Sequence, residues 1–116
     1  MSYSLVDLDC NPDYSDAERM SHEEISTHLA QIPDWEHSFS DDESKIIRTF
    51  RLRNFNEAIK LANKIAAEAD RQDHHPSIVL EWGRCTVTWW THALSGLHLN
   101  DFIMAAKSDK LASQEI

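Results

Sequence analysis

The sequence contains few residues of several types, and each scarcity excludes a class of protein. Only two glycines and three prolines occur among 116 residues, of which 41% are hydrophobic. This composition argues against disorder and favours a packed core. Cys10 and Cys85 are the only cysteines, too few for a disulfide framework. We therefore expect free thiols in a reducing compartment.

Long apolar runs are also missing. No apolar stretch approaches the roughly 20 residues that a membrane-spanning helix requires. Residues 1–7 contain neither a basic start nor a sustained apolar run, so we expect no signal peptide. Together with the free thiols, these features predict a cytoplasmic protein.

Positive charge is scarce as well. The chain carries 20 acidic and 11 basic residues, a net charge of −9. A field of this sign repels nucleic acid and anionic membrane surfaces, so neither is expected as a partner. The length fits one domain, and a domain this small gains stability readily from oligomerisation.

The chain divides into a polar segment and one domain. Residues 1–20 are aperiodic and contain the turn signal Asn11-Pro12-Asp13, so we expect a loose N-terminal arm. Residues 21–112 are expected to form a single domain, because regular apolar patterns begin there.

Two capping boxes mark the first two helices. Ser21 and Glu24 precede a short apolar stretch that Pro33 ends. Asn54 and Glu57 repeat the pattern and open the strongest helix. The apolar stripe of that helix is expected to consist of Phe55, Ala58, Ile59, Ala62, Ile65, Ala66 and Ala69.

Alternating residues indicate four strands, at 35–39, 46–52, 78–82 and 85–92. Arg48 is the exception on the apolar face of the second strand. Gly83-Arg84 predicts a two-residue hairpin turn with glycine first, and a last helix is capped by Asn100 or a neighbour. The order α-β-β-α-β-β-α predicts an α+β fold, an antiparallel sheet with helices on one face.

Histidines occupy the most informative segment. His74 and His75 lie in a loop after the long helix, and His92 ends the last predicted strand, where it could face that loop. Imidazoles suit proton transfer because both protonation states are accessible near neutrality. Nearby carboxylates could orient these rings or bind a ligand, and tryptophans could form a flat wall for a heterocycle; these residues are Asp70, Asp73, Asp101, Trp82, Trp89 and Trp90.

Structural roles compete with these functional ones. A histidine pair after a helix can simply complement the negative end of the helix dipole, and strand tryptophans are more often core or interface. Zinc bound by His74, His75, His92 and a carboxylate is another alternative. Adjacent histidines lack the i, i+4 spacing of familiar zinc sites, so the metal signal is weak. The residues alone predict a small α+β domain with a candidate histidine site.

The same segment resembles the pterin-4a-carbinolamine dehydratase family, in its bacterial branch. The shared pattern is an acidic residue, Asp70, then the run 74–76 (His-His-Pro), an aromatic, Trp82, a third histidine, His92, and a later aspartate, Asp101. The similarity covers about residues 21–109. It implies an α+β domain with a four-stranded antiparallel sheet, in proteins that form dimers or tetramers.

The resemblance also implies an activity. Family members are hydro-lyases, 4a-hydroxytetrahydrobiopterin dehydratases, which convert 4a-hydroxytetrahydropterin (pterin-4a-carbinolamine) to quinonoid dihydropterin and water without metal or organic cofactor. This reaction recycles the pterin of aromatic amino acid hydroxylases, and phenylalanine hydroxylase is the implied partner. The implied catalytic residues are His74, His75 and His92, and the implied substrate-binding residues are Asp70, Asp73, Trp82, Thr91 and Asp101.

Two positions depart from the animal members. Asp70 replaces a glutamate that is more common there, and Asn100 stands where they carry arginine. Animal members also act as dimerisation cofactors for a transcription factor, so a protein-interaction or regulatory module is the alternative function. The complete histidine trio favours the enzyme.

Overall fold

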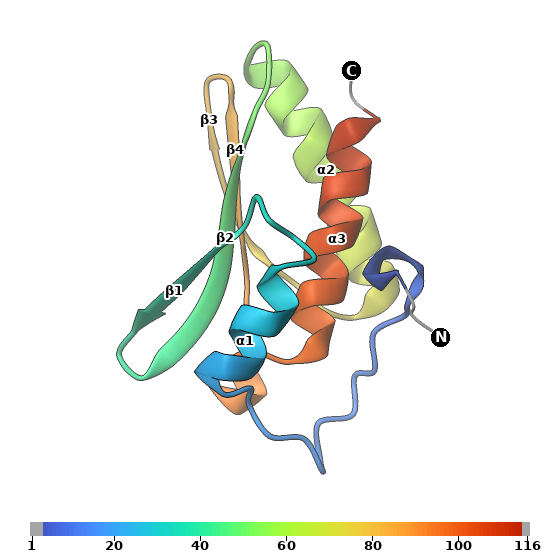
Figure 1. Cartoon of the computed structure of the whole chain (residues 1–116). Coiled ribbons are helices and arrows are strands. Elements are labelled where there is room, and N and C mark those ends of the chain that lie inside the picture. Colours follow the sequence, from blue (N-terminus) through green and yellow to red (C-terminus); the bar gives the residue numbers. More distant parts are fainter. Residues whose placement is uncertain (1–3, 115–116) are drawn as a thin grey trace.

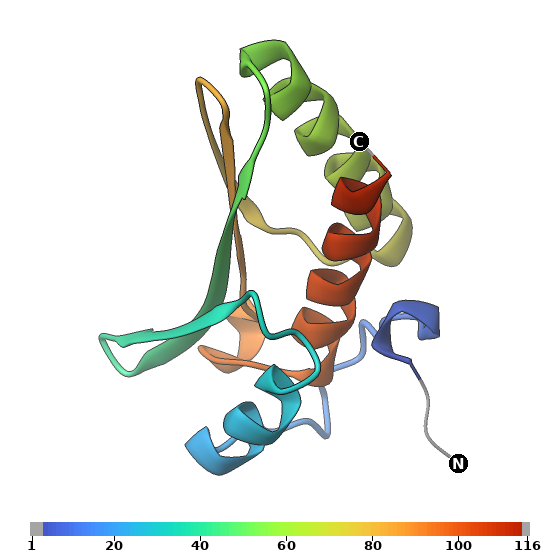
Figure 2. The ribbon, with the colours of Figure 1, turned by 45° about the horizontal axis from the view of Figure 1, so that its top comes forward.

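Four antiparallel strands form the sheet that supports the whole molecule (Figure 1). The computed structural model describes residues 4–114. Strands β1 (Glu36–Ser40), β2 (Glu43–Arg51), β4 (Arg84–Trp89) and β3 (Ser77–Glu81) lie side by side in that order. The helices are α1 (His22–Leu29), α2 (Phe55–Gln72) and α3 (Leu99–Ser113), with 3-10 turns η1 (Leu5–Asp7) and η2 (His92–Leu94). All three α-helices lie on one side of the sheet (Figure 2), so the predicted α+β architecture is confirmed.

Local capping explains where the helices begin. Ser21 and Glu24 form the predicted reciprocal box, with N···O distances of 2.9 and 3.2 Å. Asn54 accepts a hydrogen bond from the Glu57 amide (2.9 Å), which is one half of the second box. Helix α3 is capped by His98, a neighbour of Asn100: its ring nitrogen accepts from the Asn100 amide (3.0 Å). Each cap satisfies an amide that the first helical turn leaves free.

Helix α2 packs on the sheet through a stripe that differs from the predicted one. The buried residues are Ala58, Leu61, Ala62, Ile65 and Ala69. Phe55 is 43% exposed and Ala66 is also exposed, because the buried stripe follows the i, i+3, i+4 spacing that includes Leu61. The prediction was wrong at these positions.

Two other predictions about the last hairpin were also wrong. The turn residues are Trp82 and Gly83, since Glu81 pairs with Arg84, and Gly83 adopts the left-handed φ of +72° that favours glycine. The last strand stops at Trp89. The chain then closes a short loop, in which Thr91 bridges to Gly96, and His92 begins η2 within that loop.

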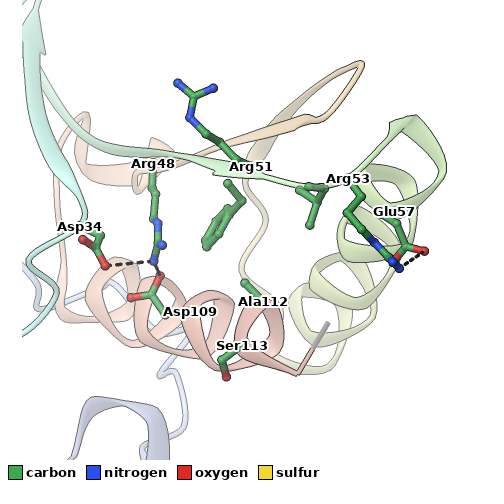
Figure 3. A pocket seen from close by; sticks show the side chains of 10 residues that line it. Asp34, Arg48, Arg51, Arg53, Glu57, Asp109, Ala112 and Ser113 are labelled. Carbon is green, nitrogen blue, oxygen red and sulfur yellow. Dashed lines mark hydrogen bonds and ion pairs between the residues drawn. The ribbon is translucent and has the colours of Figure 1, made fainter. Parts of the chain in front are cut away.

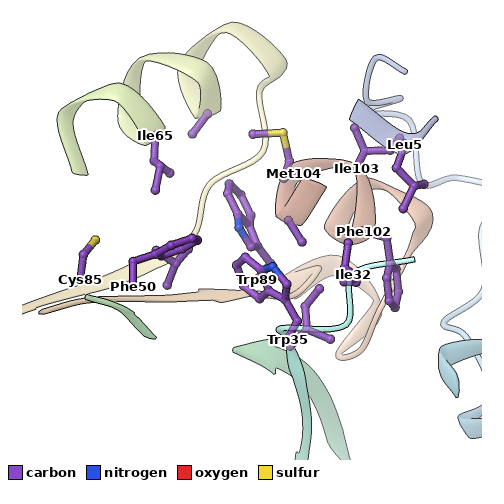
Figure 4. Close-up of a cluster of buried hydrophobic side chains, with 14 of the residues drawn as sticks. Leu5, Ile32, Trp35, Phe50, Ile65, Cys85, Trp89, Phe102, Ile103 and Met104 are labelled. Atoms are coloured by element: carbon purple, nitrogen blue, oxygen red, sulfur yellow. The ribbon is translucent and has the colours of Figure 1, made fainter. Parts of the chain in front are cut away.

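The core lies between the sheet and the helices, with Trp89 and Trp35 at its centre (Figure 4). Arg48, the exception on the inner face of β2, has two carboxylate partners there. Its guanidinium bonds Asp109 at 2.7 Å, lies 3.6 Å from Asp34 and packs over the Phe50 ring at 4.3 Å. Within residues 4–114, no helix is long and apolar enough to cross a membrane.

The N-terminal segment differs from the expectation of a loose arm. Residues 4–20 run along α3 and around its N-terminal end (Figure 1). Leu5 is buried in the core, and Lys107 on α3 donates to the Val6 carbonyl (2.8 Å). Further along, the Cys10 amide donates to Gln72 (2.8 Å) and the Met20 amide to the Leu97 carbonyl (2.8 Å). Contacts to α2 and α3 therefore hold residues 4–20 in place. Residues 1–3 of the predicted arm lie outside the described residues.

Candidate active site

A fully buried carboxylate, Asp101, organises the end of the sheet where the histidine loop lies. Its Oδ2 accepts hydrogen bonds from the Thr91 hydroxyl (2.8 Å) and the His98 amide (3.0 Å). Its Oδ1 lies 2.6 Å from Nε2 of His74. Because Asp101 and Thr91 are 0% and 1% exposed, these bonds form in a low-dielectric environment, where hydrogen bonds to a carboxylate are strong.

The His74 side chain is buried, and its ring contacts Trp89, Asp101 and Tyr14. It is 7% exposed, and its ring stacks on Trp89 with a centroid separation of 5.6 Å and an interplanar angle of 16°. One ring nitrogen faces Asp101, and the other lies 3.3 Å from the Tyr14 hydroxyl. Burial raises the pKa of Tyr14 above its ordinary value, although its bond to Asn100 opposes the shift. The phenol is therefore protonated at neutral pH.

His75 occupies a different environment from its neighbour. Its ring is exposed, and its Nε2 lies 2.9 Å from Oδ1 of Asp70 at the end of α2. Asp73 ends the helix in the left-handed conformation (φ 54°), and this reversal carries the chain out of α2 into the histidine loop. His75 thus combines an accessible imidazole with a carboxylate partner, the arrangement that general acid–base chemistry uses.

His92 reaches the same end of the molecule by another route. Ser77 on β3 pairs with Thr88 on β4, so the segments before β3 and after β4 leave the sheet together. The exposed His92 ring packs on Trp90 at 4.5 Å, and the Lys45 ammonium lies 4.0 Å above that indole. Trp90 Nε1 is the one buried side-chain polar atom within residues 4–114 that lacks a hydrogen-bond partner.

Arg19 secures the loop that carries His92. Its guanidinium donates to the carbonyls of Asp42 (2.7 Å) and Ser95 (3.2 Å) and pairs with the Asp42 carboxylate (3.1 Å). Gly96 lies directly beneath this side chain, since a Cβ at that position would be 2.9 Å from Arg19 Cβ. The absence of a side chain at residue 96 allows this close approach.

The predicted site residues therefore fall into two groups. Hydrogen bonds join His74 of the histidine loop to Asp101 on α3 and Asp101 to Thr91. A separate bond joins His75 to Asp70. Asp73 and His92 are adjacent in the chain to His74 and Thr91, at the same end of the sheet. Trp82 lies apart from them, because it forms the turn at the opposite end of β3, where it is 72% exposed.

Three residues that line this region were not among the predicted site residues. Tyr14 and His98 meet edge to face, with centroids 5.0 Å apart, and Asn100 donates to Tyr14 (2.8 Å). Burial lowers the pKa of His98, although the charge of Asp101 opposes the shift. The departure at Asn100 from animal members was the one available signal, and its buried side chain, 1% exposed, shows why this position matters.

A hollow lies away from the histidines, between β2 and the C-terminal part of α3 (Figure 3). It measures about 680 Å³ and is lined by Phe50 and Leu52, with Arg48, Asp109 and Asp34 forming an ion-pair cluster at its side. None of the histidines lines it. Within residues 4–114, no three His, Cys, Asp or Glu side chains are grouped so as to hold a metal ion.

Comparisons with known proteins identify the class of this fold and site. A sequence profile described as "Pterin 4 alpha carbinolamine dehydratase" matches residues 18–111. A Marinobacter nauticus protein named "Putative pterin-4-alpha-carbinolamine dehydratase" is 44% identical over 108 residues, 93% of this chain and 97% of that protein. A crystal structure from Brucella melitensis, described as a transcriptional coactivator/pterin dehydratase, has a TM-score of 0.74 at 28% identity, covering 82% of this chain and 99% of that chain.

These matches place the chain among the hydro-lyases. It belongs to the pterin 4 alpha carbinolamine dehydratase family. The resemblance inferred from the histidine pattern is thereby confirmed.

Proposed function

We propose that this protein dehydrates 4a-hydroxytetrahydropterin to quinonoid dihydropterin by histidine acid–base catalysis. Family membership supports the reaction. The observation that carries the histidine mechanism is the contrast between a buried, fully bonded His74 and an accessible His75 on the adjacent residue.

The reaction needs one proton delivered and one removed. The bond from C4a to the hydroxyl oxygen breaks, and the departing oxygen takes a proton to leave as water. A proton is lost from a ring nitrogen of the pterin, whose electron pair forms the new double bond. The protons balance, so the site must hold one acid and one base on the same substrate, and it needs no redox partner. Imidazoles can serve both tasks near neutral pH.

We assign the two proton transfers to His75 and His92, because both rings are exposed at the same end of the sheet. His75, supported by Asp70, delivers the proton to the leaving hydroxyl, and His92 takes the ring-nitrogen proton. His74 fixes the loop, since both of its ring nitrogens already have partners.

Substrate contacts are proposed from the same region. Asp73 is exposed beside the histidines and can accept hydrogen bonds from the amino group and ring N–H of a pterin. Trp90 gives an indole face next to His92. Thr91 and Asp101 act through His74, because they bond each other and the carboxylate bonds that ring. Trp82 lies at the opposite end of β3 from the histidines, so we propose no contact between Trp82 and a pterin bound at the histidines of the same chain.

The cellular role extends this proposal. Dehydration would recycle the pterin cofactor of aromatic amino acid hydroxylases in the cytoplasm, with phenylalanine hydroxylase as the partner enzyme. A homodimer or homotetramer is the proposed assembly, because a domain of this size gains stability from association. Size-exclusion chromatography with light scattering measures the assembly directly.

Stopped-flow absorbance of freshly generated 4a-hydroxytetrahydropterin tests the activity. Wild type should accelerate formation of quinonoid dihydropterin, and His75→Ala and His92→Ala should each lower kcat about 100-fold or more, the usual contribution of a general acid or base. His22→Ala is the matched control, since this exposed histidine contacts His37 and Phe39 on β1, the edge strand opposite β3. Full activity in both site variants would refute the assignment.

A binding or regulatory role is the second candidate. The Brucella melitensis structure is described as a transcriptional coactivator as well as a pterin dehydratase. If wild type leaves the spontaneous dehydration rate unchanged, the interaction role becomes the better explanation of the fold.

A further inference from the structure

Tyr14 brings the N-terminal arm into contact with the histidine loop. Its hydroxyl oxygen lies 3.3 Å from Nδ1 of His74, 60 residues away in the sequence. The family profile begins at residue 18, so this tyrosine lies outside the matched segment. The contact therefore joins a residue outside the profile to a histidine inside it.

The hydrogen atoms around Tyr14 can be placed from its partners. The Asn11 amide donates to Oδ1 of Asn100 (3.0 Å), which fixes the orientation of that carboxamide. Its Nδ2 then donates to the Asn11 carbonyl (2.7 Å) and to the Tyr14 oxygen (2.8 Å). Because Tyr14 accepts from Asn100, its own O–H hydrogen is available for Nδ1 of His74.

The bond on the other side of the His74 ring, from Nε2 to Asp101, can be given a direction in the same way. Asp101 already accepts from Thr91 and His98, and a carboxylate only accepts. Nε2 of His74, 2.6 Å away, must therefore carry the hydrogen. One directed series of bonds results, from the Asn100 amide to Tyr14, from Tyr14 to His74, and from His74 to Asp101.

We propose that Tyr14 is a positioning residue of the dehydratase site, which fixes the His74 ring as the tautomer that accepts at Nδ1 and donates at Nε2. The effect on turnover rests on the proposed function, whereas the hydrogen bonding does not. Successive bonds polarise one another, so the Tyr14 hydroxyl strengthens the bond from His74 to Asp101. A firmly held His74 in turn fixes the backbone that carries His75.

Contacts elsewhere in the arm keep Tyr14 in place. The Cys10 amide bonds Gln72 on α2, and Val6 accepts from Lys107 on α3. The Tyr14 ring also meets His98 edge to face at 5.0 Å. These contacts do not involve the hydroxyl, so Tyr14→Phe removes only the two bonds of that hydroxyl, the one to His74 and the one from Asn100, and keeps the packing of the arm.

The test compares wild type with Tyr14→Phe by nuclear magnetic resonance of nitrogen-15 histidine and by stopped-flow kinetics. His74→Gln identifies the His74 signals by their loss. In Tyr14→Phe, the Nδ1 signal should move to that of a nitrogen accepting no hydrogen bond, and the Nε2–H proton should shift upfield and exchange faster with water. We expect kcat to fall between about twofold and tenfold with KM unchanged, the effect of one neutral hydrogen bond.

Lys107→Met is the matched control, because it removes the arm contact at Val6 and leaves the contacts of Cys10 and Asn11, which are closer to Tyr14 in the chain, in place. It should change neither the His74 signals nor kcat. Unmoved His74 signals in Tyr14→Phe, or a kcat equal to or above that of wild type, would overturn the inference. If wild type itself shows no dehydratase activity, the proposed function fails, and the resonance comparison still decides whether Tyr14 bonds His74.

Discussion

Replacing Asp101 by asparagine should reverse the hydrogen bonding of His74. The amide oxygen can take the place of Oδ2 and keep the Thr91 and His98 donors. The amide NH2 then faces Nε2 of His74, where two donors would meet at 2.6 Å. The ring must therefore move its hydrogen to Nδ1 and donate to Tyr14, whose own hydroxyl loses its acceptor.

The expected cost follows from the bonds that change. Three charge-assisted hydrogen bonds become neutral, and each falls from about 1.5–3 to about 0.5–1.5 kcal/mol. Removing a buried charge returns part of this loss. We expect Asp101→Asn to lower the free energy of unfolding by about 1–3 kcal/mol. Asp101→Ala leaves three buried donors without an acceptor and should cost about 3–5 kcal/mol.

Urea denaturation at neutral pH, followed by tryptophan fluorescence, measures these values. Asp16→Asn, at an exposed position in the arm, is the control and should stay within about 0.5 kcal/mol of wild type. Histidine nitrogen-15 spectra of Asp101→Asn should show the hydrogen of His74 on Nδ1. Unchanged stability together with an unchanged tautomer would refute the reasoning that Asp101 is an ionised acceptor for His74.

Other predictions follow from the described contacts. Burial lowers the pKa of His98, so the unfolded chain binds a proton there more readily and stability should fall as pH drops below about 6.5. His98→Asn keeps a cap that does not titrate and should show a smaller fall between pH 7.5 and 5 in urea titrations; equal falls would contradict this. Burial raises the pKa of Cys85 to about 11, so a disulfide reagent at pH 8 should label this thiol much faster in urea than in the folded protein, and rapid labelling of the folded protein would be inconsistent with its burial. Asp109→Asn removes the charge that Arg48 and Trp35 bond (2.7 and 2.8 Å) and should cost about 1–2 kcal/mol in urea denaturation, whereas a cost near zero would show that this pair is not stabilising.

Local sequence rules predicted the elements well because their causes are local. Ser21 and Glu24 are three residues apart, and the bonds that start α1 involve only that turn. Alternation along β2 and β4 likewise reflects a sheet with one buried face. The fold class followed from the order of these elements.

Errors arose where distant contacts decide the structure. The predicted last strand ended at His92, but the Thr91–Gly96 bridge takes the chain away from the sheet two residues after β4 ends. Trp82 belongs to the family pattern, yet a pattern gives identity and spacing without position, and this residue lies at the opposite end of β3 from the histidines.

The N-terminal arm is the clearest case in which distant contacts, which local sequence rules do not predict, decide the structure. Nothing in the neighbourhood of Tyr14 predicts a bond to His74, because the two residues are 60 positions apart. The buried Asn100 provides the matching acceptor and donors for the arm. Composition alone made residues 1–20 resemble a flexible tail, since polar side chains that bond a distant partner look the same as solvated ones.

The Arg19 guanidinium has a consequence for how the protein opens locally. This one side chain bonds the tip of the β1–β2 hairpin at Asp42 and the η2 loop at Ser95. Breaking its bonds frees both segments at once, so their amides should exchange with solvent as one unit. Fluctuations at the hairpin tip would thereby reach the loop that presents His92.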